Sequence, residues 1–320
     1  MESKIHELAW ENSRKLRNRL DHQGISFFHY TSPAGFMNII QPGGRIKLWF
    51  TQYDSLNDKT ERAEFFNFLK RYCLRREDAG KFSSAFCERI ANLKGSDRCI
   101  ISLRDADWTN SDGQKVPTTH VKAMECDTYL CCFSTESDSL AMWNYYSKSD
   151  WYEGYSIEFF NNDYTFGCFE KGYSLTVQKV LYSETEKTTL LDEILIPFAQ
   201  VYEKVTDEYK EKIISFIQSE INQLQFAFKS SCFEHEKEVR AILRVPKNGF
   251  DDCQRFERRY RTNKGIIIPY VELDIAESSI GRITIAPLLE SNIAKKNAED
   301  FLSSRGHNVF VETSRVPIRF

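Results

Sequence analysis

The acidic segment "FEHEKEVRAIL", residues 233–243, carries the side chains with the clearest chemical use. Glu234, Glu236, Glu238 and Arg240 are spaced two residues apart, so an extended backbone would align them on one face. One carboxylate there can bond a sugar hydroxyl and stabilise a developing oxocarbenium cation, while the neighbouring acid steers the acceptor. Arg240 would moderate the negative charge. A face that simply meets water explains the same pattern.

A histidine, a tyrosine and a threonine end a predicted strand in "FFHYTSPAGF", residues 27–36. The period-two alternation of a strand puts His29 and Thr31 on one face and Tyr30 on the other. A neutral histidine can donate to a ribose hydroxyl or a carbonyl. We expect His29 and Thr31 to face the cleft that holds the acidic segment. The alternative is a buried histidine bonded to backbone, with Thr31 and Ser32 capping the next helix.

A serine and aromatic segment, "CFSTESDSLAMWNYY", leads from a predicted strand into a predicted helix. The rings of Trp143 and Tyr146 can stack on a nicotinamide or a nucleobase, and the hydroxyls of Ser134 and Ser139 can fix a carboxamide. An aromatic stripe of this kind also fits a core. In "YDSLNDKTE", Asn57 could position a loop over a ligand, or it could bond its own backbone in a turn.

Composition narrows the class of protein. The chain has 320 residues, is 41% hydrophobic and carries a formal net charge of -3, which indicates a globular protein without a general excess of positive charge for polyanions. Nine cysteines without a C-x-x-C pair are interpreted as reduced thiols of a cytoplasmic protein. We expect no metal, because the histidines are dispersed, and no membrane span, because no apolar run reaches about 18 residues.

The elements that must position these side chains follow from hydrophobic periodicity. Residues 1–22 are predicted to form an N-terminal helix, and residues 23–320 a single α+β domain with helical insertions near 59–98 and 190–228. Its sheet is expected to be mixed, mostly antiparallel and flanked by helices, and residues 104–120 are predicted to be a polar loop. Strands are predicted near 25–31, 45–51, 96–103, 128–134, 153–160, 174–183, 237–245, 264–273, 281–287 and 308–314. Further helices are predicted at 32–40, 61–77, 81–98, 135–148, 207–230 and 291–306.

In their order along the chain, these motifs resemble the bacterial family catalogued as domain of unknown function 2971. The resemblance covers most of the chain from about residue 27 onward, and its most specific parts are H-Y-T, F-S…M-W-x-x-Y and E-x-E-x-R. That family in turn resembles the ADP-ribosyltransferase fold, which is an analogy at the level of the fold. Tyr30 stands where many histidine-class transferases have glycine.

The resemblance implies a role for each motif. The histidine would hold the nicotinamide-side ribose, one of the two serines would take the central serine position, and Trp143 or Tyr146 would stack on nicotinamide. The late-strand acid would be catalytic, with the second acid two residues before it. The implied catalytic residues are Glu238 and Glu236, and the implied binding residues are His29, Tyr30, Thr31, Asn57, Ser134, Ser139, Trp143, Tyr146 and Arg240.

The function expected from this resemblance is cleavage of the nicotinamide–ribose bond of NAD by an ADP-ribosyltransferase or NAD glycohydrolase. NAD would be a substrate, and the acceptor would be a protein or a nucleic acid that the sequence does not identify. A role as a bacterial toxin or phage-defence effector is compatible with that chemistry. The alternative is a non-catalytic nucleotide-binding or partner-binding module with the same fold. The sequence carries no signal for the oligomeric state.

Overall fold

The structure is a computed structural model that describes residues 2–22, 24–56, 61–109, 115–147, 153–161, 173–247, 256–263, 265–287 and 291–317. The chain divides into two compact units. The helical unit comprises residues 1–21, 56–99 and 178–234, and the sheet unit comprises residues 22–55, 100–177 and 235–320. The predicted N-terminal helix and most of both predicted insertions therefore gather in one unit, which has a hydrophobic core of its own.

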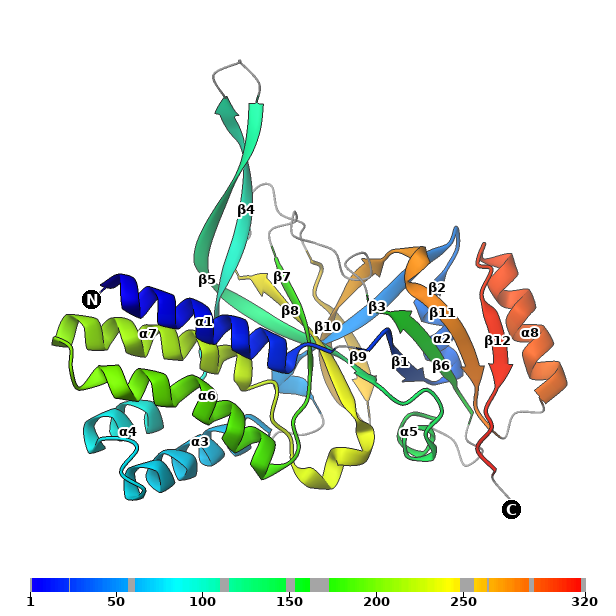
Figure 1. The fold of residues 1–320 in the computed structure, drawn as a ribbon. Helices are drawn as coiled ribbons and strands as arrows, with labels where there is room; N and C mark the ends of the chain where they lie inside the picture. The colour runs from blue at the N-terminus through cyan, green and yellow to red at the C-terminus, as the bar shows by residue number, and fades with distance from the viewer. Residues whose placement is uncertain are drawn as a thin grey trace. The chain divides into compact units, whose positions relative to one another are not determined.

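The helical unit is built from amphipathic helices around that core (Figure 1). In the helix predicted at residues 207–230, apolar residues recur at helical spacing, and Ile213, Ile217, Ile221 and Leu224 are all buried. A serine side chain accepts a hydrogen bond from the first turn of two of the helices, at the N-cap positions Ser83 and Ser183. The helices are α1 (Glu2–Leu20), α3 (Glu61–Asp78), α4 (Ser84–Ala91), α6 (Glu184–Tyr202) and α7 (Asp207–Leu224).

Strands dominate the sheet unit. Among the described residues, twelve strands form one sheet whose main path runs β12-β11-β6-β1-β5-β3-β10-β9, with β2, β4, β7 and β8 attached beside it. All pairings with a known register are antiparallel except the parallel pair β11–β12, so the predicted mixed and mostly antiparallel sheet is confirmed. The strands are β1 (Ser26–Thr31), β2 (Ile40–Gln41), β3 (Arg45–Gln52), β4 (Arg98–Thr109), β5 (Lys115–Ser134), β6 (Tyr155–Phe160), β7 (Ser174–Lys179), β8 (Glu238–Pro246), β9 (Arg259–Asn263), β10 (Ile266–Ile275), β11 (Ile280–Ile285) and β12 (Phe310–Thr313).

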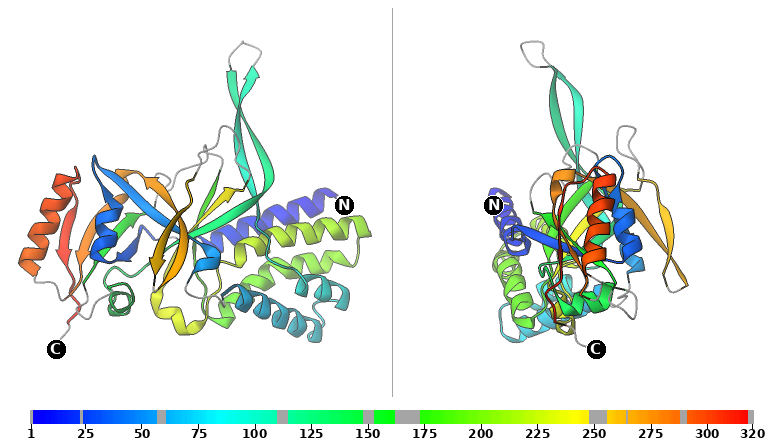
Figure 2. Two further views of the ribbon diagram at one scale, coloured as in Figure 1. Left: turned by 180° about the vertical axis from the view of Figure 1, so that it is seen from behind. Right: turned by 90° about the vertical axis from the view of Figure 1, so that its right-hand side faces the viewer.

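Short helices cover the two faces of this sheet. On one face, Phe36 of α2 stacks on Tyr155 and contacts Phe301 of α8, and α8 lies alongside β12 in Figures 1 and 2. On the other face, α5 packs Met142 and Trp143 on β1. The helices are α2 (Pro33–Ile39), α5 (Leu140–Tyr146) and α8 (Ser291–Ser304), and the 3-10 turns are η1 (Tyr53–Ser55), η2 (Ser231–Glu236), which crosses the boundary between the units, and η3 (Glu277–Ser279).

The structure departs from the predicted elements in three places. The polar loop expected at residues 104–120 is instead largely strand, because β4 and β5 extend into it and pair as a long ribbon (Figure 1). The acidic segment becomes extended only at Glu238, since the residues before it form the turn η2. Glu234 is therefore exposed and does not share a strand face with Arg240. The sequence also does not predict β9, whose composition is mostly charged and polar.

Two global properties can be compared with the predictions. No helix among the described residues has the length and apolar character needed to cross a membrane. The prediction that every cysteine is a reduced thiol is wrong at Cys126, which is disulfide-bonded. Five others are free, namely Cys73, Cys87, Cys131, Cys132 and Cys232.

Candidate functional site

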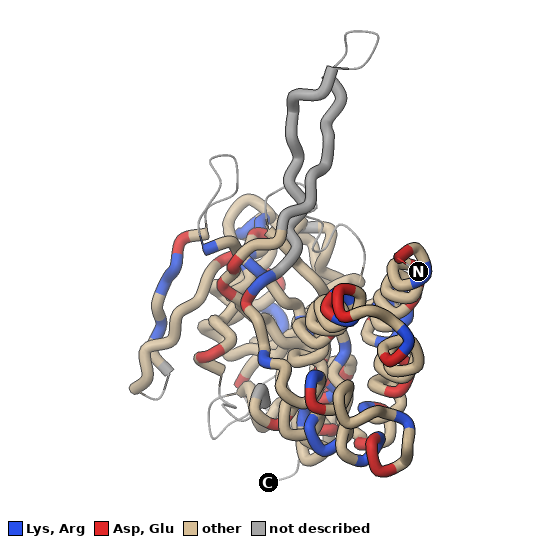
Figure 3. The backbone as a smooth tube through the Cα atoms, turned by 90° about the vertical axis from the view of Figure 1, so that its left-hand side faces the viewer, with Lys and Arg blue, Asp and Glu red and all other residues tan. Residues whose placement is uncertain are grey.

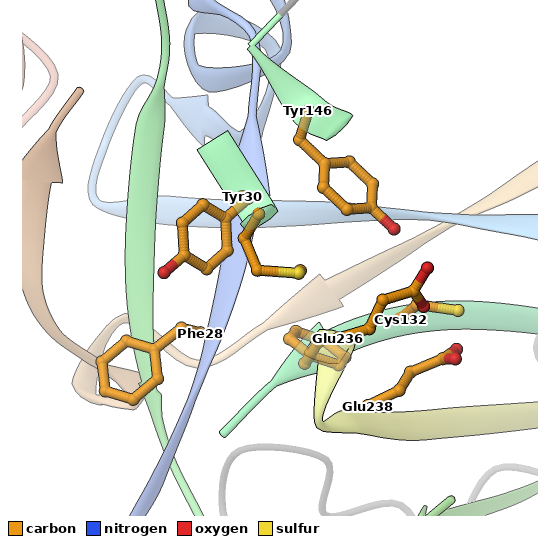
Figure 4. Close-up of a pocket in the computed structure, with 8 residues that line it drawn as sticks. Phe28, Tyr30, Cys132, Tyr146, Glu236 and Glu238 are labelled. Carbon is orange, nitrogen blue, oxygen red and sulfur yellow. The ribbon is translucent and has the colours of Figure 1, made fainter. Parts of the chain in front are cut away.

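A small pocket opens in the sheet unit where α5 covers the ends of three strands (Figure 4). It holds about 230 Å³ of empty volume, the open solvent at its mouth included. Its walls are mostly aromatic and sulfur-bearing, and two carboxylates stand at one side. The lining residues are Phe28 and Tyr30 of β1, Cys132 and Phe133 of β5, Met142 and Tyr146 of α5, Glu236 of η2 and Glu238 of β8.

The two carboxylates reach the pocket because the backbone turns sharply between them. Glu236 ends η2, Glu238 begins β8, and both side chains are buried. Lys237 between them has a φ of 44°, a left-handed conformation that non-glycine residues seldom adopt. The Thr135 N–H holds this turn by donating to the Lys237 carbonyl over 2.9 Å. Strained backbone of this kind gathers at functional sites. Both acids turn toward the same space in Figure 4.

Arg240 holds one of the acids in a fixed position. Its guanidinium donates to both carboxylate oxygens of Glu238, over 2.8 Å from Nε and 3.1 Å from the second nitrogen. The register of β8 on β5 places Glu238 opposite Ser134 and Arg240 opposite Cys132. Arg240 is only 1% exposed, so this is a deeply buried, bidentate ion pair. Arg240 therefore orients a pocket carboxylate and does not line the pocket.

Cys132 contributes a thiol beside Glu238. Burial, reinforced by the nearby negative charge of Glu238, raises the pKa of the Cys132 thiol well above its ordinary value. A thiol with a raised pKa stays protonated at neutral pH and is a poor nucleophile. The side chain therefore acts as a wall and as a hydrogen-bonding neighbour of the acid.

The two tyrosines of the pocket differ in what their hydroxyls do. The Tyr30 hydroxyl donates to the Glu136 carbonyl over 2.8 Å and accepts from the Ser139 N–H over 3.0 Å, so only its ring faces the pocket. Burial raises the pKa of Tyr30. Tyr146 is 36% exposed, and its hydroxyl turns toward Glu236 and Glu238 in Figure 4. Tyr146 is thus placed to meet a ligand.

Neither of the two predicted serines lines the pocket. Ser134 is fully buried, and its hydroxyl donates to the Glu236 carbonyl over 2.7 Å and accepts from the Glu136 N–H over 3.1 Å. It fixes the backbone of Glu236 and does not line the pocket, contrary to the prediction that it could hold a carboxamide. Ser139 is the N-cap residue of α5, where its side chain makes no capping bond.

Trp143 is a core residue. It is 1% exposed, its indole N–H donates to Asp138 Oδ1 over 2.8 Å, and its ring meets Tyr30 edge to face at 4.7 Å. No face of the ring is open for a ligand, so the prediction that Trp143 stacks on nicotinamide is contradicted, and the core interpretation of this aromatic stripe holds for it. The ring supports Tyr30 from behind.

His29 and Thr31 lie on the opposite side of β1 from the pocket. Phe28 and Tyr30 line the pocket, so the residues that alternate with them point away from it. The Nδ1–H of His29 donates to the Cys132 carbonyl over 3.0 Å, and its ring meets Phe133 at 5.5 Å. Burial is the main cause that lowers the pKa of His29. The prediction that His29 and Thr31 share a cleft with Glu236 and Glu238 is therefore corrected.

Several site features fall outside the sequence predictions. Asn57 lies outside the described residues. Phe28 and Met142 were not predicted, although each had a signal: Phe28 alternates with Tyr30 on a strand, and Met142 precedes Tyr146 by four residues on a helix. Within the part of the chain that the structure describes, no group of three His, Cys, Asp or Glu side chains could hold a metal ion.

Comparison with known proteins yields one family. The model of a family described as "Protein of unknown function (DUF2971)" matches residues 142–241. The match begins at Met142 of α5 and ends just after Arg240, so it contains the Tyr146, Glu236 and Glu238 side of the pocket and leaves out β1. It supports the resemblance to this family over these residues. No curated protein and no solved structure matches the chain.

Proposed function

We propose that this protein cleaves the nicotinamide–ribose bond of NAD, as an ADP-ribosyltransferase or an NAD glycohydrolase with an ADP-ribosyltransferase-like fold. The observation that carries the proposal is the pair of buried carboxylates, Glu236 and Glu238, which turn into one aromatic-walled pocket. Paired acids in a dry site are suited to a reaction in which positive charge develops on a sugar.

The apolar walls of the pocket suit one ring of the substrate. A nicotinamide ring could enter between Phe28, Tyr30 and Met142, with the rest of the dinucleotide outside. Flat apolar walls favour a planar ring of this kind.

The chemistry assigns a different task to each acid. As the bond breaks, nicotinamide leaves with the bonding electron pair and the ribose carbon becomes an oxocarbenium cation. Glu238, held by Arg240, would stabilise that cation. Water or another acceptor then forms the new bond to the ribose carbon, and its proton would pass to Glu236. Tyr146 would hold the ring or the ribose through its hydroxyl.

A non-catalytic nucleotide-binding module is the second candidate. It is favoured by the bidentate pairing of Glu238 with Arg240, which offsets the negative charge that the reaction needs. The engagement of Ser134 and Trp143 within the protein also leaves fewer groups for a substrate. In this case NAD or ADP-ribose would bind and remain intact.

Release of nicotinamide from NAD tests the two candidates. We expect wild-type protein, supplied with cell extract as a source of acceptors, to release nicotinamide, and Glu236→Gln to reduce the rate by about a hundredfold or more. Glu234→Gln is the matched control, because this exposed acid lies outside the pocket, and it should leave the rate unchanged. No release by the wild type, or equal rates for Glu236→Gln and wild type, contradicts the enzymatic proposal. Calorimetric binding of NAD without release supports the binding module.

A toxin or defence role would follow from NAD cleavage in a bacterial host. Expression of the wild type should then slow growth and lower cellular NAD, and Glu236→Gln should relieve both effects. Growth defects that persist in Glu236→Gln would separate toxicity from this pocket.

A further inference from the structure

Arg261 of β9 is a cation without a carboxylate partner among the described residues. Its terminal nitrogen donates to the Thr51 hydroxyl over 2.8 Å, and its Nε–H is buried without a hydrogen-bond acceptor. The other two arginines nearby on the chain are paired. Arg259 contacts Glu257 and Glu272, each at 2.9 Å, and Arg258 contacts Asp127 at 2.6 Å.

Three neighbouring strands bring an aromatic surface to Arg261. The register places Tyr270 of β10 opposite Thr51 of β3, and Arg261 opposite Ile268. The guanidinium carbon lies 5.7 Å from the centre of the Trp49 ring, and the rings of Trp49 and Tyr270 are 4.7 Å apart. Arg261 and Trp49 are both half-buried, so parts of the two side chains reach solvent, whereas the Nε–H of Arg261 does not.

Within the described part of the chain, no negative charge compensates Arg261 at neutral pH. The groups that interact with its charge are His29, Cys131 and Tyr270. Burial raises the pKa of the Cys131 thiol to about 12, and the pKa of His29 is lowered by burial and by Arg261 itself. Glu272 on β10 is already shared by Arg259 and Lys47, each at 2.9 Å.

A sheltered guanidinium with a spare N–H is unfavourable unless an anion meets it. Taking an unpaired charge out of water costs several kcal/mol on general grounds, and burial lowers the pKa of Arg261 accordingly. An oxyanion would accept from the guanidinium, whose planar set of donors matches phosphate geometry. The Thr51 hydroxyl already accepts from Arg261 and can donate its own proton to the same anion.

We propose that Arg261, Thr51 and the Trp49 ring form a binding site for a phosphate group, in a part of the sheet that does not line the Glu236 and Glu238 pocket. The class of ligand is a phosphate-bearing anion, either free or carried by a nucleotide whose base can rest on the aromatic surface. The proposal rests on these three side chains and stands whether or not the protein cleaves NAD.

Titration calorimetry with inorganic pyrophosphate, ADP and adenosine tests the site. We expect pyrophosphate and ADP to bind the wild type, and Arg261→Gln to weaken both by about tenfold or more, as the loss of a charge-assisted hydrogen bond predicts. Arg259→Gln is the matched control on the same strand, since Arg259 is exposed and already paired, and its affinities should stay within about twofold of the wild type. ADP binding more tightly than pyrophosphate assigns the nucleotide, and equal affinities assign the free anion.

Thermal unfolding provides a second readout that does not depend on ligand. If Arg261 serves a ligand, Arg261→Gln should keep or raise the melting temperature, because an uncompensated buried charge is removed. Wild-type protein that binds neither pyrophosphate nor ADP at millimolar concentration overturns the proposal. So do unchanged affinities in Arg261→Gln, adenosine binding as tightly as ADP, or a large loss of melting temperature in Arg261→Gln. None of these results depends on nicotinamide release.

Discussion

The helical unit and the sheet unit each contain charged side chains that are shielded from solvent, and these side chains differ in whether they line a pocket. In the helical unit, Asp192 of α6 accepts from Tyr72 over 2.7 Å and from Arg76 over 2.5 and 2.6 Å, both of which lie on α3. Lys187 of the same helix donates to the Lys229 carbonyl over 2.7 Å. Charges of both signs are spread along these helices in Figure 3. In the sheet unit, Glu236 and Glu238 turn into an open pocket.

The difference separates stabilising charges from candidate functional ones. A buried charge whose partner lies on another element ties the two elements together, and removing one partner leaves the other uncompensated. A buried charge at the wall of a pocket is available to a ligand, which is why such groups point to sites. Glu238 is paired with Arg240 of the same strand, so the pair joins no two elements, and its carboxylate still lines the pocket.

The largest loss of stability should come from a substitution in the core of the sheet unit. Trp143→Ala removes a buried ring that supports Tyr30, and we expect it to lower the free energy of unfolding by about 3–5 kcal/mol. Denaturant unfolding measures this loss. Leu140→Ala is the control on the same helix, since Leu140 is 45% exposed, and it should have a much smaller effect. Equal losses in the two variants would contradict a core role for Trp143.

A broken charge pair in the helical unit should lower the free energy of unfolding slightly less than Trp143→Ala does. Asp192→Ala leaves Arg76 and Tyr72 without their acceptor, and we expect a loss of about 2–3 kcal/mol for this half-buried group. Circular dichroism during urea unfolding measures it. Glu211→Ala removes the exposed partner of Arg89 and should have a much smaller effect, because solvent screens that pair. If nicotinamide release per folded molecule falls in Asp192→Ala, the assignment of this charge to stability alone is wrong.

A substitution in the pocket should change the activity of the protein and leave its stability unchanged. Tyr146→Phe removes one hydroxyl from a partly exposed side chain, so we expect an unchanged melting temperature and a loss of about tenfold in nicotinamide release or in NAD affinity. Tyr145→Phe, next to it, removes a hydroxyl that contacts His235 outside the pocket lining and serves as the control. A melting temperature that falls in Tyr146→Phe without any change in rate or affinity would reverse the interpretation.

The smallest expected effect is a pH dependence of stability that comes from Glu220 in the helical unit. Burial raises the pKa of Glu220, against the opposing effects of Ser13 and Arg17. For an acid with a raised folded-state pKa, its contribution to stability is greatest below the unfolded pKa and is lost as the pH rises through the folded value. Glu220→Gln should therefore gain stability relative to the wild type as the pH rises above the ordinary pKa of a glutamate, as measured by unfolding at each pH. A difference that does not change with pH would contradict this.

Local sequence patterns predicted many of the helices and strands and the two acids that line the pocket. The stripe of α7 follows from helical spacing, and the cap of α2 follows from Ser32 and Pro33, since the Ser32 hydroxyl accepts from the Gly35 N–H. The pairing of Glu236 with Glu238 was visible as a spacing of two residues. The left-handed Lys237, which lets a turn and a strand present both acids to one pocket, has no such local signal.

The sequence by itself determined that residues 26–31 form a strand with alternating faces, because side-chain alternation is a local property of the backbone. Only the tertiary structure decided which face meets the acids. Phe28 stands opposite Ser134, more than a hundred residues away, and this register turns Tyr30 toward Glu238 and His29 away from it. In the same way, the packing of strands and helices decides that Trp143 is buried and that Arg261 meets no carboxylate among the described residues. Such pairings are set by long-range contacts that no local spacing encodes.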